Sequence, residues 1–314
     1  MKNNRGFSII ELMVALVLSS ILLLGLSEVF SANQQSYTQQ NAFARVQESG
    51  RISMELLSRS IRMADYWGCF NGGLPNINNL LDDDDSFSYD IDNFSESLAG
   101  ADDVSSVSIS SKAVTDGTDT LTIRGASTNN GVTVGTPYMN TNSAALHVST
   151  GNGFAQEDIL LLSDCESAEL FQVTSANPDT SGQVTHNTGT GTPGNYSQNF
   201  SKTYAGDAFI LSPYTKVFFV AAGAFSGTSL WQNLNGVNTE LVSGVTNIQL
   251  QYGEDDNEDG TVDNFYDADN AALDMEKVLS IQITLSMDSG ENLQVGGAAF
   301  TRSINSTVAI RNRL

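Results

Sequence analysis

A short acidic run, residues 255–263, carries the side chains best suited to bind a metal ion. It reads Asp-Asp-Asn-Glu-Asp-Gly-Thr-Val-Asp, so that side-chain oxygens recur at alternate positions. Calcium takes roughly six to eight oxygen ligands, and a glycine permits the sharp turn that such a loop needs. The spacing therefore predicts a calcium site, with ligands from Asp255, Asn257, Asp259, Thr261 (through its carbonyl) and Asp263.

The first nine places of this loop match an EF-hand-type calcium loop, but its continuation departs from that pattern. The twelfth place, usually glutamate, is Tyr266, so Asp267 or Asp269 would have to complete the ligand shell. A strand pattern at residues 248–252 precedes the loop, where an EF-hand has a helix. The alternative is an acidic turn exposed to solvent, and both interpretations stay open.

The first residues form a candidate site for proteolytic processing. Lys2 and Arg5 precede Gly6, and an apolar run from Phe7 to Leu26 follows at once. An ordinary signal peptide is cut after its apolar core, next to small residues. Here a bulky phenylalanine occupies the position before the only candidate, residues 31–32. Cleavage between Gly6 and Phe7 is therefore expected, and it would leave the apolar segment on the mature chain.

Glu11 lies inside the apolar run, where an unpaired ionised carboxylate costs several kcal/mol. Cleavage would give Phe7 a free amine, with which Glu11 of a neighbouring copy could pair in a polymer. The run is long enough to cross about 30 Å of hydrocarbon as a helix, and the basic residues before it predict that the rest of the chain lies outside. The alternative is an uncleaved anchor helix with an isolated acid.

Gly6, Phe7 and Glu11, with the basic leader, resemble the prepilin leader of type IV pilins and of type II secretion pseudopilins. The resemblance implies that a prepilin peptidase removes residues 1–6 and N-methylates Phe7. Major pilins usually carry a helix-breaking proline in this first helix, whereas the first proline here is Pro75.

The helix is expected to continue to residue 63, with residues 7–26 in the membrane and the remainder amphipathic. Apolar or small residues recur there at spacings of three and four, which predicts one buried face: Phe43, Val46, Gly50, Met54, Leu57 and Ile61. Arg51, Glu55 and Arg59 lie four apart on another face and are expected to form ion pairs.

Residues 64–314 predict a β-rich head. Alternating apolar residues indicate strands at 248–252, 279–287 and 300–310, and shorter strands are expected at 121–124, 158–162, 170–174, 208–211 and 216–220. Segments 126–143 and 175–201 are predicted to be long loops, and Asp82–Asp85 to be a solvated loop. The fold class is therefore α+β: a long N-terminal helix, membrane-spanning in its first half, packed on a β-rich globular head.

The two cysteines, Cys69 and Cys165, are predicted to form a disulfide in an exported head. Such a bridge would tie the end of the helix to the strand at 159–162. The alternative is a pair of buried free thiols.

Charge and composition argue against nucleic-acid binding and against catalysis. The net charge of −22 repels phosphate backbones. The two histidines, His147 and His186, have no neighbouring serine, cysteine or acid pattern typical of a nucleophile motif. We therefore expect no enzymatic activity and no nucleic-acid partner.

Segments scattered over the chain resemble PilW-type minor pilins: residues 64–69, 162–165, 170–174, 240–245, 251–253, 278–285 and 307–313. The resemblance implies a minor pilin of type IV pili that forms a priming or tip complex with other minor pilins. Its further partners would be the major pilin, the prepilin peptidase, the inner-membrane assembly platform and a tip adhesin.

The same resemblance implies a single-pass protein of the inner membrane whose head lies in the periplasm before assembly and on the extracellular pilus afterwards. Two alternatives remain open at this point. One is a minor pseudopilin of a type II secretion system, and the other is a membrane-tethered, calcium-dependent adhesin.

Overall fold

The computed structural model describes residues 8–70, 76–82, 96–189, 191–224, 227–290, 294–295 and 298–313. Lys2, Arg5, the predicted cleavage site at Gly6 and Phe7, and Asp83–Asp85 of the acidic run lie outside the described residues.

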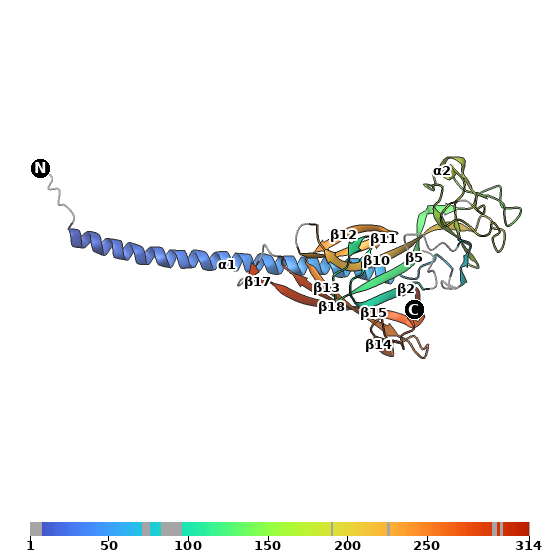
Figure 1. The fold of residues 1–314 in the computed structure, drawn as a ribbon. Coiled ribbons are helices and arrows are strands. Elements are labelled where there is room, and N and C mark those ends of the chain that lie inside the picture. Colours follow the sequence, from blue (N-terminus) through green and yellow to red (C-terminus); the bar gives the residue numbers. More distant parts are fainter. Residues whose placement is uncertain are drawn as a thin grey trace.

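One long helix, α1 (Ile9–Arg62), forms a stalk that ends inside a β-rich head (Figure 1). Its first half projects from the head with every apolar side chain exposed, and it is long and apolar enough to cross a membrane. The α+β class, with a long N-terminal helix and a β-rich head, is thereby confirmed. The helix ends at Arg62, within one residue of the predicted end.

The second half of α1 packs on the head along the predicted apolar face. Its buried residues are Ala42, Val46, Gly50, Ser53, Leu57 and Ile61. A Cβ atom at Gly50 would lie 2.1 Å from Cδ1 of Ile304, so glycine permits the close approach of the helix to strand β18 (Thr301–Ala309). Phe43, predicted to be buried, is 43% exposed, because the helix emerges from the head there, and its ring meets Phe300 edge-on.

The larger sheet has the central strand order β1-β8-β7-β10-β11-β12, with β5 beside β10 and β2 beside β5. The strands are β1 (Asn78–Asn79), β2 (Leu98–Val104), β5 (Thr118–Thr133), β7 (Ile159–Ser163), β8 (Ala168–Gln172), β10 (Phe209–Ala222), β11 (Thr228–Leu234) and β12 (Val237–Ser243).

The second sheet has the order β14-β13-β15-β18, with all neighbours antiparallel. Its other strands are β13 (Val245–Glu254), β14 (Asn264–Tyr266) and β15 (Val278–Asp288). The predicted alternation is confirmed from Ile281 to Met287, because Ile281, Ile283, Leu285 and Met287 are all fully buried, whereas Leu279 is only partly buried.

The remaining elements are short. They comprise the strand pairs β3 (Ser108–Ile109) with β4 (Lys112–Ala113), β6 (Leu146–His147) with β9 (Gln183–Val184), and β16 (Gln294–Val295) with β17 (Ala298–Ala299). The helix α2 (Pro178–Ser181) and the 3-10 turns Met275–Lys277 and Arg311–Arg313 complete the fold.

Two segments differ from the sequence prediction. Residues 208–211 and 216–220 are not two strands but parts of the single strand β10, which passes through Pro213. Residues 126–133, predicted to begin a loop, continue β5, because the long β10 offers them a partner. The predicted loop at 175–201 contains α2 and β9 but is otherwise irregular.

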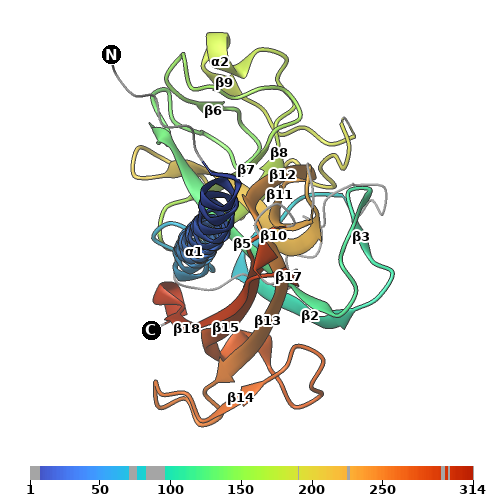
Figure 2. The same ribbon diagram turned by 90° about the vertical axis from the view of Figure 1, so that its left-hand side faces the viewer.

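The head has two main hydrophobic cores. One lies between α1 and the two sheets, and we call this part the proximal lobe. The other is formed mainly by residues 132–210 at the end of the head farthest from the stalk, and we call this part the distal lobe. Figure 2 looks nearly along α1 and shows the strands of both sheets to one side of it, with β6, β9 and α2 of the distal lobe above.

Candidate functional sites and their family

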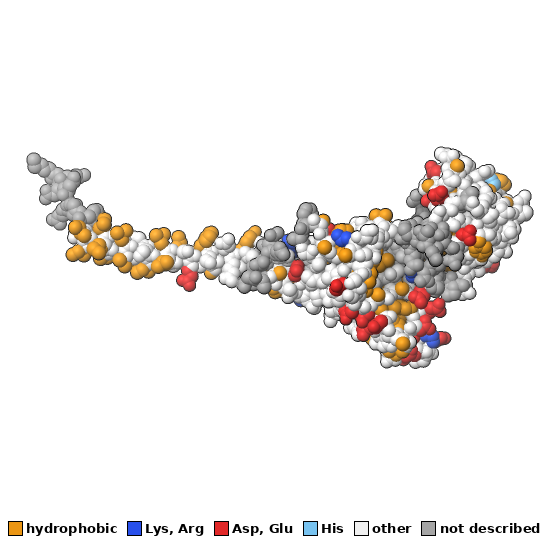
Figure 3. All heavy atoms as spheres, in the orientation of Figure 1, with side chains coloured by type: hydrophobic (Ala, Val, Ile, Leu, Met, Phe, Trp, Pro, Cys, Tyr) orange, Lys and Arg blue, Asp and Glu red, His pale blue; other side chains and the backbone are white. Residues whose placement is uncertain are grey.

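The exposed half of α1 carries the predicted assembly residue. Glu11 lies in the first turn of the helix, among exposed apolar side chains. Figure 3 shows hydrophobic side chains along the exposed half of α1. No other residue of the described helix up to Leu26 is charged. Among the residues that the structure describes, Glu11 has no ion-pair partner, and a pairing role with a neighbour's Phe7 stays a prediction.

The predicted disulfide is confirmed. Cys69, just after α1, is joined to Cys165, just after β7, with Cα atoms 4.8 Å apart. The two cysteines are 96 positions apart in the sequence, and the bridge ties the segment that follows α1 to the end of β7. Lys202 reinforces this corner through ion pairs with Asp164 (2.6 Å) and Glu166 (3.3 Å).

The segment that follows α1 also contacts the C-terminal segment. The Arg313 guanidinium pairs with Asp65 at 3.0 Å and donates to the carbonyl of Val278 and to the hydroxyl of Ser97. Asp65 in turn accepts a hydrogen bond from the indole of Trp67 at 2.8 Å. Segments 64–69 and 307–313, both singled out in the sequence, therefore meet in space.

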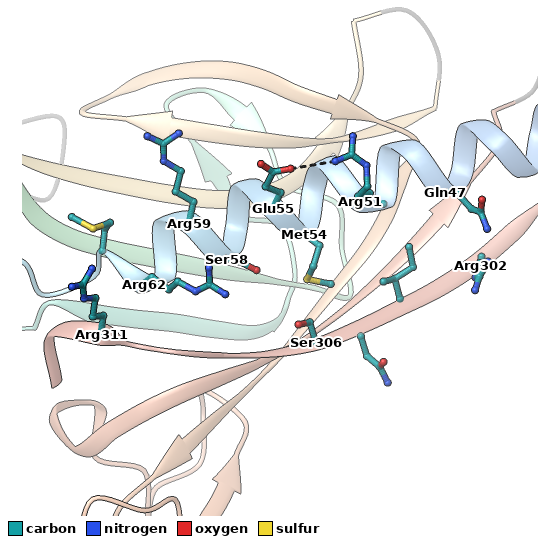
Figure 4. A pocket seen from close by; sticks show the side chains of 14 residues that line it. Gln47, Arg51, Met54, Glu55, Ser58, Arg59, Arg62, Arg302, Ser306 and Arg311 are labelled. Carbon is teal, nitrogen blue, oxygen red and sulfur yellow. Dashed lines mark hydrogen bonds and ion pairs between the residues drawn. The ribbon is translucent and has the colours of Figure 1, made fainter. Parts of the chain in front are cut away.

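A groove of about 1140 Å³ lies between the second half of α1 and β18. Arginines dominate its lining: Arg51, Arg59, Arg62, Arg302 and Arg311. The whole chain has only 14 basic residues against 36 acidic ones, so this groove is a local basic surface on an acidic protein. Figure 4 shows Arg62 and Arg311 at one end and Arg302 at the other, with Met54 and Ser306 between them.

The predicted ladder on α1 forms in part along this groove. Arg51 pairs with Glu55 at 3.4 Å, as expected, and with Glu48 at 2.8 Å. All three side chains are exposed, so the pairs add little stability. The Arg59 charge instead acts on Lys216, whose pKa is lowered mainly by burial and further by this like charge.

The acidic loop 255–263 connects β13 to β14, as the strand pattern before it indicated. Asp255 is buried, and its two oxygens accept the backbone N–H groups of Asp259 (3.1 Å) and Gly260 (2.8 Å). Asp263 accepts from the backbone of Asp256 at 3.0 Å. The carboxylate oxygens thus hold the loop together, and each keeps a further lone pair.

Calcium binding by this loop stays a prediction. Asp255, Asp259 and Asp263 are not among the carboxylate groups whose oxygens converge within 4.8 Å in the described part of the chain. Asp267, expected to complete the shell, accepts instead from Gln251 at 3.2 Å. Hydrogen bonds from Thr261 lower the pKa of Asp259, which is therefore ionised at neutral pH.

A second acidic group that could hold a metal ion was not predicted from the sequence. Oxygens of Asp102, Asp103 and Asp119 all lie within 4.8 Å of one another, on β2 and β5. Burial raises the pKa of Asp119 to about 6. The adjacent pair Asp102-Asp103 was the available sequence signal, but nothing local indicated that Asp119 would join it.

Each of the two histidines makes structural contacts. His186 is buried against the rings of Phe171 and Phe200, and burial lowers its pKa, so that it is neutral at physiological pH. The His147 ring lies 3.3 Å from the side-chain amide of Gln183. Neither arrangement resembles a nucleophile–base pair.

An exposed, membrane-length apolar helix that carries a β-rich head defines a membrane-anchored pilin-like protein. Residues 1–27 match the family model of the prokaryotic N-terminal methylation motif. Residues 217–312 match the family model of type IV pilus-assembly protein W. Together these matches confirm the predicted resemblance to PilW-type minor pilins, which are structural proteins.

The second match has a clear place in the fold. It begins within β10 and continues through β11, β12 and the whole second sheet, so it covers much of the proximal lobe and little of the distal lobe. No curated protein and no solved structure matches the chain.

Proposed function

We propose that this chain is a minor pilin that helps to form the priming or tip complex of a type IV pilus. One observation carries the proposal. A leader with the methylation motif stands directly before an exposed apolar helix, and residues 217–312 of the β-rich head match the PilW model. Before assembly the protein would lie in the inner membrane, with its head in the periplasm. Afterwards it would lie on the extracellular pilus.

Deletion of the gene tests this function directly. We expect the deletion strain to lose most surface pili, and a wild-type copy to restore them. Normal piliation together with a loss of protein secretion would favour the alternative, a minor pseudopilin of a type II secretion system. The match to a pilus-assembly family favours the pilus.

The processing step has its own test. We propose that a prepilin peptidase cuts between Gly6 and Phe7 and that the mature chain begins with N-methyl-Phe7. Mass spectrometry of the wild-type protein should find this N-terminus, and Gly6→Leu should retain the leader. An intact leader on the wild-type protein would favour a tethered adhesin that does not polymerise.

Assembly is proposed to depend on Glu11. In a low-dielectric filament core, the neighbour's Phe7 amine needs a carboxylate partner. Glu11→Leu should therefore insert into the membrane normally but enter filaments poorly. Ser19→Leu, on the same exposed helix, is the matched control. Wild-type amounts of the Glu11 variant in sheared pili would contradict the pairing.

The arginine-lined groove is the surface that we propose contacts a neighbouring pilin subunit. Its concentration of guanidinium groups fits an acidic face on that subunit, and it lies on the same helix that anchors the chain. A double variant, Arg51→Glu with Arg302→Glu, should reduce incorporation into pili. Arg45→Glu lies on α1 outside the groove lining and should have little effect.

The further partners proposed are the major pilin, other minor pilins, the assembly platform and a tip adhesin. Pull-down of the full-length protein from membranes, with and without the groove variant, would identify which of these contacts depends on the groove. For the loop at 255–263 we propose weak calcium binding, near the roughly 10⁻⁴–10⁻³ M range of extracellular modules.

A further inference from the structure

A bulge in strand β2 brings three carboxylates together. The pairing of β2 with β5 runs in register up to Ala101 opposite Thr120 and resumes at Val104 opposite Thr118. Two residues of β2, Asp102 and Asp103, therefore stand opposite the single residue Asp119. Asp103 takes a left-handed backbone conformation, with φ of 41°, to make this possible.

Asp119 is the fixed member of the group. It is 2% exposed, and its carboxylate accepts the backbone N–H of Asp103 at 2.9 Å and that of Leu250 at 2.7 Å. Leu250 belongs to β13 in the second sheet, so Asp119 connects the two sheets. These bonds orient the carboxylate and leave it further lone pairs for another ligand.

Tyr252 supplies an independent observation at the same place. This residue of β13 is fully buried, and its hydroxyl has no hydrogen-bond partner among the residues that the structure describes. The hydroxyl lies over Gly100, where an added Cβ atom would stand 2.0 Å from it. Gly100 and Asp102 are two residues apart on β2 and so share one face of the strand. Burial raises the pKa of Tyr252, and the negative charges of Asp119 and Asp102 raise it further.

Further negative charge surrounds the group. Burial raises the pKa of Asp102, a hydrogen bond with the Asp119 carboxyl lowers it, and the charges of Asp103, Asp267 and Asp269 raise it. The side-chain amides of Gln249 and Gln251 donate to Asp103 and Asp267, both at 3.2 Å, and an amide brings no positive charge. A cation would offset this repulsion and would give the Tyr252 hydroxyl a polar partner.

We propose that Asp102, Asp103 and Asp119, with the Tyr252 hydroxyl behind them, form a binding site for a divalent cation, with calcium preferred. All the donors are oxygens, as a hard cation requires, and an irregular bulge suits the flexible coordination of calcium better than the strict octahedron of magnesium. The ion would join β2 and β5 to β13 and so tie the two sheets together. This site is separate from the loop at 255–263 and does not depend on the pilus function.

The test uses the full-length chain in detergent, carrying Asp259→Ala so that the acidic loop contributes little. After removal of bound ions with a chelator, calcium chloride is titrated in by calorimetry, followed by magnesium chloride in a separate run. We expect calcium to bind, and Asp102→Asn to weaken binding about tenfold or more. Asp207→Asn, an exposed aspartate of the distal lobe, should leave the affinity unchanged.

Two further variants test the proposed cation site independently of Asp102. Asp103→Asn changes an exposed member of the group and should also weaken binding without disturbing the fold. Tyr252→Phe removes only the hydroxyl and should weaken binding several-fold. Circular dichroism confirms that each variant is folded. Equal calcium titrations for the Asp259→Ala chain with and without Asp102→Asn would overturn the proposal, as would no calcium binding to either. In that case the aspartates only share a proton.

Discussion

The proximal and distal lobes are held together in different ways. The proximal core is continuous, with α1 laid across two sheets and large apolar side chains from both. The distal lobe has short strands, a smaller core and buried polar networks. At its centre the buried carboxylate of Glu169 accepts from the Ser201 backbone at 2.8 Å and from the Tyr204 hydroxyl at 3.0 Å.

The long strands β5 and β10 both run between the two lobes. β5 contributes Leu121 and Ile123 to the proximal core and Val132 to the distal core. β10 contributes Ile210 to the distal core, Leu211 to the cluster around Trp67, and Phe218 and Val220 to the proximal core. The PilW match covers much of the proximal lobe and little of the distal one. The family match therefore falls mainly on the continuously packed lobe, whereas the more polar distal lobe lies largely outside it and is joined to the segment after α1 by a covalent bridge.

Removal of the disulfide bridge is expected to have the largest effect on stability. Cys69→Ser should lower the free energy of unfolding by about 4–5 kcal/mol, because the unfolded chain regains the freedom of a long loop. Urea unfolding of the full-length protein in detergent measures this, and limited proteolysis should show cleavage first in residues 132–210. A loss below about 1 kcal/mol would mean that the distal lobe does not rely on the bridge.

The helix should stabilise the proximal lobe through packing. Leu57→Ala removes a fully buried side chain of α1 and should cost about 2–5 kcal/mol. Leu22→Ala is the matched control, since Leu22 is 73% exposed on the same helix. Urea unfolding in detergent should separate the two variants clearly. Equal losses of unfolding free energy in the two variants would show that the stability of the head does not depend on the buried face of α1.

The proximal lobe should carry a pH dependence that originates at Asp119. Because burial raises the pKa of Asp119 to about 6, the folded state keeps a proton that the unfolded state releases near its ordinary value of 3.8. This residue therefore makes the protein less stable as pH rises through that window and costs about 1–2 kcal/mol above it.

The measurement is the unfolding free energy between pH 4 and pH 7 in chelator, for wild type and Asp119→Asn. The difference between the two proteins should change as pH rises through about 6 and level off about one pH unit above that value. A constant difference would show that Asp119 titrates normally in the folded protein.

The smallest effect is expected in the acidic loop. Asp259 is exposed and ionised, so Asp259→Ala should change the calcium-free stability by no more than about 0.5 kcal/mol. Differential scanning fluorimetry should show that the variant loses any rise in melting temperature that depends on calcium at this loop. Asp158→Ala in the distal lobe is the control and should keep the calcium-dependent rise of the wild type, although it removes the acceptor of the Ala155 backbone N–H.

Much of the fold follows from short-range patterns in the sequence. The spacing of Val46, Leu57 and Ile61 predicted the buried face of α1, and the alternation from Ile281 to Met287 predicted β15. These patterns are reliable because the periods of 3.6 and 2.0 residues are properties of the local backbone. The disulfide was predictable for a simpler reason, since an exported chain with two cysteines has one pairing.

The tertiary structure alone decided the rest. Residues 126–133 became strand because the long β10 lay beside them, a contact that their polar sequence did not indicate. The five arginines of the groove come from two segments about 250 positions apart and meet because β18 packs on α1. Asp119 joins Asp102 and Asp103 through a bulge in strand pairing. Such groupings depend on register between distant segments, which a local sequence pattern does not encode.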